Sequence, residues 1–142
     1  MNVLLVSESF RRRAFYKRLL LQFGVEEYGI LQADGVADAL AAENREGVDF
    51  ILCALNEGSA SLRLVRAIRA LDATVPIVMV GEISDRPAIV EAIRSGCSDY
   101  LMSPVSSDTL EEKLCKWGGL HSESAALDEA SAVSRFCAAA VH

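Results

Sequence analysis

The chain has 142 residues, of which 51% are hydrophobic, and it carries a formal net charge of −6 with a pI near 4.9. This length suits one domain with a full core, and the apolar content excludes an intrinsically disordered chain. The acidic balance argues against non-specific nucleic-acid binding. Because neither a leader-like segment nor a long apolar run stands out, we expect a cytoplasmic protein without nucleic-acid or membrane partners.

The first part of the chain alternates short apolar runs with helical periodicity. Residues 1–6 form an apolar run that predicts a strand, and residues 9–23 predict a helix that ends at Gly24. One side of this helix carries Phe10, Ala14, Leu20 and Phe23. Its arginines lie mostly elsewhere and are interpreted as a solvated face, with a docking surface as the alternative. Residues 28–33 predict a second strand, and Asp34 is a suitable N-cap for a helix that ends at Gly47.

Residues 49–58 contain the stretch around which the chain is organised. The unbroken apolar run that begins at Phe50 is typical of a strand buried on both faces of a parallel sheet. In an open α/β sheet, ligands and chemistry gather at the carboxyl ends of the strands. The residue at that end is Ala54, which has no functional group.

The second part of the chain continues the alternation. Ser61 can cap a helix with apolar residues at every third position, and residues 75–80 predict a fourth strand. A helix around Pro87 closes near Gly96, and residues 99–102 predict a fifth strand. The next helix starts near Ser107, runs to Trp117 and has a capping-box arrangement of Asp108 and Glu111.

Five strands alternating with five helices predict an α/β fold with a doubly wound parallel sheet. The natural arrangement is the flavodoxin-like (βα)5 order 2-1-3-4-5, with an extra C-terminal helix. Residues 1–117 would form the domain, and residues 118–142 a linker and an amphipathic helix. The crevice at the carboxyl ends of the strands should be lined by Ser7, Glu8, Ala54, Gly81 and Ser103.

The four cysteines are widely spaced and form no C-x-x-C pair; they are Cys53, Cys97, Cys115 and Cys137. We interpret them as reduced packing residues. A metal site or a disulfide framework is the alternative, but both histidines, His121 and His142, lie in the tail and do not support a metal site.

The sequence resembles a receiver domain, the phospho-acceptor module of two-component response regulators. The resemblance covers residues 1 to about 117. Its most specific part is residues 92–104, which are similar to the family signature A-x-x-x-G-A-x-D-Y-L-x-K-P. Residues 3–6 and 49–53 resemble the first and third strands of the family.

The resemblance implies a site of five positions, and this chain departs at four of them. In the family, an aspartate after the third strand attacks a phosphoryl donor, and two acidic residues after the first strand hold Mg²⁺. A hydroxyl after the fourth strand and a lysine after the fifth bind the phosphoryl oxygens. The matching residues here are Ser7 with Glu8 for the acidic pair, then Ala54, Gly81 and Ser103. We therefore expect a degenerate receiver, with no catalysis, no cofactor and no metal ion.

The aromatic residue that moves inward in the family corresponds to Tyr100. Because Gly81 replaces the hydroxyl that recruits it, we expect Tyr100 to hold one rotamer, and Gly81 leaves room for an inward ring. Ser103-Pro104 matches the position where the family has a cis peptide bond, and we expect a cis bond there.

The expected function is protein binding in signalling, independent of phosphorylation. The resemblance implies an interaction face formed by the fourth helix, fifth strand and fifth helix, near Arg86, Ile89, Arg94, Tyr100 and Lys113. A homodimer could use this face or the C-terminal helix. Two alternatives are a small-molecule binder that uses the emptied crevice, and a receiver phosphorylated at Ser7 or Ser103.

The last residues of the chain, 125–142, are alanine-rich with apolar residues three or four apart. This pattern predicts a weakly amphipathic helix. It could pack on its own domain, form a dimer contact, or begin a linker to a further domain.

Overall fold

The computed structural model describes residues 1–55, 58–81 and 86–118. It confirms the flavodoxin-like fold, with five parallel strands in the order β2-β1-β3-β4-β5. The strands are β1 (Val3–Val6), β2 (Ile30–Ala33), β3 (Phe50–Cys53), β4 (Ile77–Gly81) and β5 (Asp99–Met102). The helices are α1 (Phe10–Gln22), α2 (Val36–Glu46), α3 (Gly58–Leu71), α4 (Arg86–Arg94) and α5 (Ser107–Gly118), and a 3-10 turn spans Glu27–Gly29.

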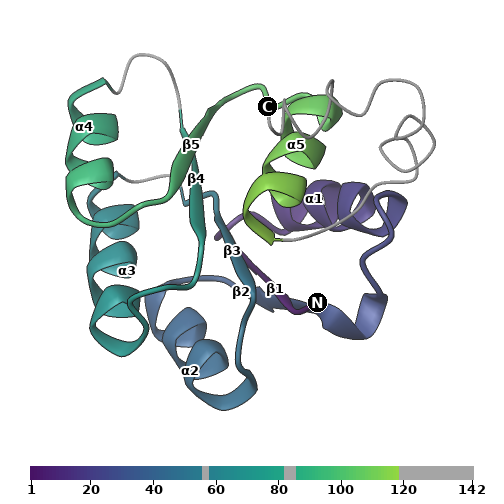
Figure 1. Ribbon diagram of the computed structural model, residues 1–142, viewed down its shortest axis with the longest axis horizontal. Helices are drawn as coiled ribbons and strands as arrows, with labels where there is room; N and C mark the ends of the chain where they lie inside the picture. Colours follow the sequence, from purple (N-terminus) through teal and green to yellow (C-terminus); the bar gives the residue numbers. More distant parts are fainter. Residues whose placement is uncertain (56–57, 82–85, 119–142) are drawn as a thin grey trace.

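The sheet separates two layers of helices. Figure 1 shows α2, α3 and α4 on one side of the strands and α1 and α5 on the other. The side chains of β3 alternate between the layers: Ile51 and Cys53 pack toward α2 and α3, whereas Phe50 and Leu52 pack toward α1 and α5. All four residues of β3 are buried, as the unbroken apolar run predicts.

The sequence pattern of α1 led to a partly wrong choice of core face. Leu20 is buried as expected, but its companions in the core are Tyr16 and Leu19. Phe10 is 74% exposed, and Ala14 also lies on the outer face. The reason is that α1 carries apolar side chains on both faces, so its periodicity does not select one of them.

The N-terminal capping of three helices also differs from expectation. Gly35 occupies the N-cap of α2, and Asp34 is instead hydrogen-bonded to Asp38, which raises the pKa of Asp38. The helix α3 begins at Gly58, so Ser61 lies inside it and its hydroxyl is 3.8 Å from the thiol of Cys53. At α5 the hydroxyl of Ser106 accepts a bond from the backbone N–H of Thr109, in place of the Asp108 and Glu111 arrangement.

The described cysteines are reduced, as predicted. None of the described cysteines, Cys53, Cys97 and Cys115, forms a disulfide, and Cys53 and Cys97 are buried. Burial raises the pKa of Cys53 to about 11 and also raises that of Cys97. Cys137 and the predicted C-terminal helix lie outside the described residues.

Among the helices that the structure describes, none combines the length and apolar composition needed to cross a bilayer. The cytoplasmic location stays a prediction.

A polar cluster connects β5 to α5. The carboxylate of Asp99 accepts a hydrogen bond of 2.9 Å from the indole N–H of Trp117 and pairs with Lys113 Nζ at 3.0 Å. Partial burial raises the pKa of Asp99, but the hydrogen bonds from Trp117, Lys113 and the Tyr100 N–H outweigh it, so the pKa is lowered overall. The negative form of Asp99 therefore stabilises the fold.

We predict that acid weakens this connection. A carboxylate with a lowered folded-state pKa contributes stability above its unfolded pKa, about 3.9, and loses that contribution as the pH falls through the folded value. Asp99→Asn should cost about 1–3 kcal/mol at pH 7 and should flatten the dependence of stability on pH below 4. Urea unfolding followed by fluorescence of Trp117, the only tryptophan in the chain, measures both effects.

The matched control is Glu112→Gln, which removes an exposed carboxylate from α5, the helix that carries Lys113 and Trp117. The assigned role of Asp99 would be wrong if Asp99→Asn and Glu112→Gln lowered the free energy of unfolding by equal amounts at pH 7 and also by equal amounts at pH 3.

Candidate functional site

The carboxyl ends of β1, β3, β4 and β5 lie at one edge of the sheet, where the predicted crevice residues meet. The backbone N–H of Ala54 donates to the carbonyl of Val6 at 2.7 Å, and that of Ser103 donates to the carbonyl of Gly81 at 2.7 Å. Ala54 is therefore next to the end of β1, and Ser103 is next to Gly81. The predicted positions form two neighbouring pairs at the switch point of the sheet.

The third-strand position offers no nucleophile. Ala54 is 1% exposed, and its methyl group belongs to the apolar cluster on the α1 and α5 side. The neighbouring thiol of Cys53 lies in the opposite cluster and is kept neutral by burial. No side chain of this strand can therefore replace a carboxylate at its end.

The residues after β1 differ in their exposure. Ser7 is 2% exposed, and its hydroxyl accepts a bond of 3.2 Å from the backbone N–H of Ser9. Ser9 in turn caps α1, because its hydroxyl accepts from the N–H of Arg12. Glu8 is exposed. The hydroxyl of Ser7 thus helps to shape the turn that starts α1.

Two arginines of α1 reach this edge, and sequence reasoning missed them. Arg12 Nη1 donates to the carbonyl of Ala54 at 3.2 Å. Arg13 Nη1 donates to the carbonyl of Ser7 at 2.6 Å, and Arg13 Nε donates to Gln32 Oε1 at 3.1 Å. The available signal was their position in the first turn after β1, since that turn must lie at the carboxyl edge of the sheet.

The residues present do not fit the Mg²⁺ that the family resemblance implies. Mg²⁺ in such sites requires carboxylates and other oxygen ligands. Glu8 is the single carboxylate of the expected pair, and the carbonyl of Ala54 is already bonded to a guanidinium. Among the described residues, no three potential metal-binding side chains come together. Positive charge at this edge instead comes from Arg12 and Arg13.

Tyr100 lies over Gly81. A Cβ built on Gly81 would overlap the Tyr100 hydroxyl and would lie 2.7 Å from Cζ of its ring. The ring is half-buried and packs against the apolar cluster on the α4 side of the sheet. The hydroxyl of Tyr100 therefore occupies the space that any side chain at position 81 would need. The Ser103-Pro104 bond is cis, as expected.

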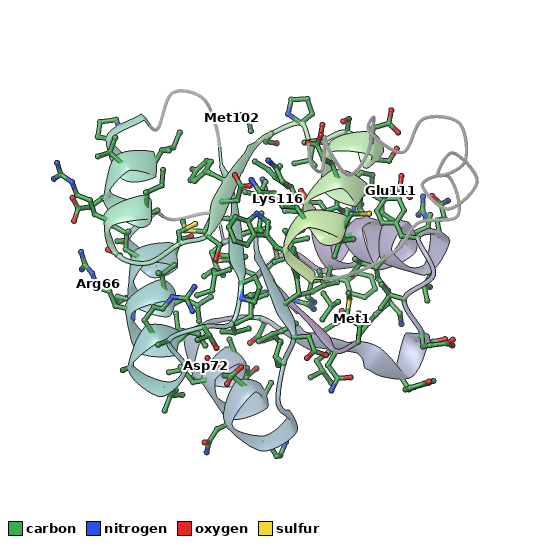
Figure 2. All side chains as sticks on the ribbon, in the orientation of Figure 1. Met1, Arg66, Asp72, Met102, Glu111 and Lys116 are labelled. Atoms are coloured by element: carbon green, nitrogen blue, oxygen red, sulfur yellow. The ribbon has the colours of Figure 1, made fainter. Side chains whose placement is uncertain are left out.

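The predicted interaction face is partly exposed. Ile89 is half-buried, Arg94 is exposed, and Lys113 forms the ion pair with Asp99. Arg86 begins α4, but its side chain lies outside the described part of the chain. The sequence-based list missed three exposed apolar side chains beside these residues: Val90, Ile93 and Met102. Figure 2 shows Met102 at the end of β5.

A match to a known family shows which family the chain belongs to. Residues 3–115 match the response regulator receiver domain. The chain belongs to the response regulator receiver domain family. Receiver domains are signalling modules of two-component systems and act with protein partners.

The chain is also similar in sequence to individual proteins. The transcriptional regulatory protein ZraR of Salmonella typhimurium is 30% identical over 119 residues, which cover 81% of this chain but 26% of ZraR. The chemotaxis protein CheY of Pseudomonas aeruginosa is 29% identical, with 82% of this chain and 94% of CheY covered. The receiver thus spans about a quarter of ZraR and nearly all of CheY.

Solved structures show the same fold. The receiver domain of NtrX from Brucella abortus has a TM-score of 0.74 at 22% identity, covering 84% of this chain and all of that domain. The receiver domain of the sensor histidine kinase PA1611 from Pseudomonas aeruginosa, solved with a magnesium ion in its active site cleft, has a TM-score of 0.70 at 22% identity. The alignment with PA1611 covers 83% of this chain and 97% of that domain.

We predict that a side chain at position 81 displaces Tyr100. Gly81→Thr should destabilise the receiver by about 1–3 kcal/mol, the usual cost of overpacking. The same substitution in a Tyr100→Ala background should cost much less, because the ring is then absent. Urea unfolding of the four proteins in this double-mutant cycle measures the coupling.

The matched control is Gly35→Thr, because a Cβ built on Gly35 meets nothing within 4 Å. An equal cost of Gly81→Thr with and without the ring would show that Tyr100 does not occupy this space.

Proposed function

We propose that this receiver is a pseudo-receiver: a signalling module that works through protein binding, without phosphorylation of its third-strand position. The observation that carries the proposal is Ala54, a buried methyl group where the family has its nucleophile. An aspartyl phosphate requires a carboxylate, and the neighbouring buried thiol of Cys53 faces the other side of the sheet.

The surroundings of Ala54 support the proposal. Phosphoryl transfer depends on metal ions and cationic groups placed around the moving phosphoryl group. Here Ser103 stands at the lysine position, and Arg12 is bonded to the carbonyl of Ala54. We infer that the guanidinium groups of Arg12 and Arg13 disfavour a divalent cation at this edge, because like charges repel.

The position of Tyr100 supports a fixed output state. In the family the aromatic ring moves inward when a hydroxyl is recruited, and in this receiver the ring already lies over Gly81. With no hydroxyl at position 81, phosphate has nothing to recruit there. We propose that Tyr100 keeps the α4 and β5 face in one arrangement.

We propose that this face binds a protein, first of all a second copy of the receiver. It is formed by α4, β5 and α5 and presents Val90, Ile93 and Met102 to solvent. Exposed apolar side chains gathered beside charged ones are typical of protein interfaces. The open edge of the sheet at β5 borders the same surface.

We predict that acetyl phosphate with Mg²⁺ leaves the intact mass of the receiver unchanged. A phosphorylatable receiver in the same reaction confirms that the donor is active. Ala54→Asp should also stay unmodified, because the acidic pair, the hydroxyl and the lysine positions would still differ from the family.

A gain of about 80 Da, the mass of one phosphoryl group, in the unaltered chain would contradict the proposal. Ser7→Ala and Ser103→Ala would then identify the acceptor. A gain in Ala54→Asp alone would show that the carboxylate is the single missing element.

We predict that Ile93→Glu weakens self-association about tenfold or more, since a charge replaces an apolar contact at the centre of the interface. Sedimentation equilibrium over a range of concentrations measures the effect. Leu71→Glu is the matched control, because Leu71 is equally exposed but lies at the end of α3.

A receiver that stays monomeric at every concentration would rule out the second copy as occupant of this face. A dimer that is equally weakened by both substitutions would place its contact elsewhere.

A further inference from the structure

A cavity of about 280 Å³ lies between α1 and the loop that joins β5 to α5. Figure 1 shows α1 and α5 on the same side of the sheet. Neither Ala54 nor Gly81 lines this cavity, although it adjoins the crevice through two shared residues, Arg12 and Ser103. Most of its wall is formed by six side chains: Arg11, Arg12, Phe15, Tyr16, Ser103 and Val105.

The polar side of the cavity is positively charged. Arg12 is half-buried and donates one hydrogen bond, from Nη1 to the carbonyl of Ala54 at 3.2 Å, which leaves other N–H groups of its guanidinium as donors. Arg11 is exposed, and no described residue forms a hydrogen bond or ion pair with it. Ser103 adds a half-buried hydroxyl. Because no carboxylate lines the cavity, these two positive charges favour an anion there.

The opposite side of the cavity is apolar and aromatic. The rings of Phe15 and Tyr16 meet edge to face, with their centroids 5.2 Å apart and an angle of 71° between their planes. Tyr16 is buried, whereas Phe15 is 43% exposed and leaves much of its ring open to solvent. Val105 packs against the apolar cluster beneath them. Such a wall suits a flat apolar ring, because aromatic rings attract one another in offset or edge-to-face contacts.

The size and the donors of the cavity limit the ligand. Its volume is near the lower end of the range of ligand pockets, about 300–1,000 Å³, so it suits a single ring better than a dinucleotide. A guanidinium group is a planar fork of donors that matches the paired oxygens of a carboxylate or a phosphate. The combination of charge, ring and size therefore defines one chemical class.

We propose that this cavity binds a small aromatic molecule that carries a carboxylate or phosphate group. Its oxygens accept hydrogen bonds from Arg11, Arg12 and the Ser103 hydroxyl, and its ring packs against Phe15. The bound molecule links α1 to the loop after β5. This site shares no residue with the exposed apolar face of α4 and β5 and requires no chemistry at Ala54, so it does not rest on the proposed function.

The experiment is an amide NMR titration of the full chain with phenyl phosphate and, separately, with benzoate. Benzyl alcohol and inorganic phosphate, at matched ionic strength, are the probes that lack the charge and the ring. We expect at least one aromatic anion to shift the signals of residues 11–16, Ser103 and Val105 in a saturable way, with a Kd of about 1–10 mM for so small a probe. The tighter of the two identifies the preferred anionic group, and the two control probes should bind about tenfold more weakly or not at all.

Variants test the two sides of the cavity separately. Arg11→Gln should weaken binding of the aromatic anion about fivefold to tenfold, because it removes a charged donor. Arg18→Gln is the matched control, since it removes the same charge from α1 at an exposed position outside the cavity. Phe15→Ala should weaken binding of the aromatic anion, whereas Phe10→Ala, which removes an exposed ring that does not line the cavity, should not. Trp117 fluorescence checks that each variant keeps its fold.

Four results would overturn the proposal. Neither aromatic anion might produce a saturable shift below about 50 mM, or the shifted signals might lie outside α1 and the loop after β5. Benzyl alcohol or inorganic phosphate might bind as tightly as the aromatic anions, which would show that charge or ring is not recognised. Equal weakening by Arg11→Gln and Arg18→Gln would show that only the overall charge of α1 attracts the probe.

Discussion

The burial of β3 on both faces is the constraint on which the rest of the structure depends. Its four residues lie between β1 and β4 in register, with Val6 opposite Cys53 and Cys53 opposite Met79. A strand covered on both sides needs helices on both sides, so the chain must cross the sheet between strands. The alternation of side chains along β3 then decides that Ala54 faces α1 and that Cys53 does not. The chemistry open to the crevice is limited by this alternation before any other residue is considered.

The switch point of this receiver still carries charged side chains, but their sign and partners differ from those of the family. Family members hold a metal ion between acidic side chains there, whereas this receiver places guanidinium groups of α1 on the carbonyls of Ser7 and Ala54. These bonds satisfy backbone acceptors at the ends of β1 and β3, which would otherwise need water or a ligand. Tyr100 fills the remaining space over Gly81. Together these contacts support the proposal that the third-strand position is not phosphorylated.

The sequence predicted the strand order well, because apolar runs, breaks and the signature of residues 92–104 are local signals. It predicted poorly where choice depended on three-dimensional packing. The core face of α1 was misjudged since Phe10 and Tyr16 are both aromatic, and only the sheet decides which one is buried. The pattern of α1 predicts a solvated arginine face, because a helical repeat does not reveal that backbone carbonyls lie within reach of Arg12 and Arg13. Ser61 was placed at a helix start because a hydroxyl reads as a cap whether or not the helix has already begun.

The division of the interior by the sheet has a consequence for how this protein can change. Leu110 and Leu114 pack in the cluster on the α1 side of the strands, and Leu64 and Ile68 pack in the cluster on the α2 side. Substitutions in one cluster should therefore add to those in the other with little interaction energy, as distant sites usually do. Each helical layer can drift in sequence on its own while the strands keep their register. Such a fold can acquire a new binding surface on one side at no cost to a surface already in use on the other.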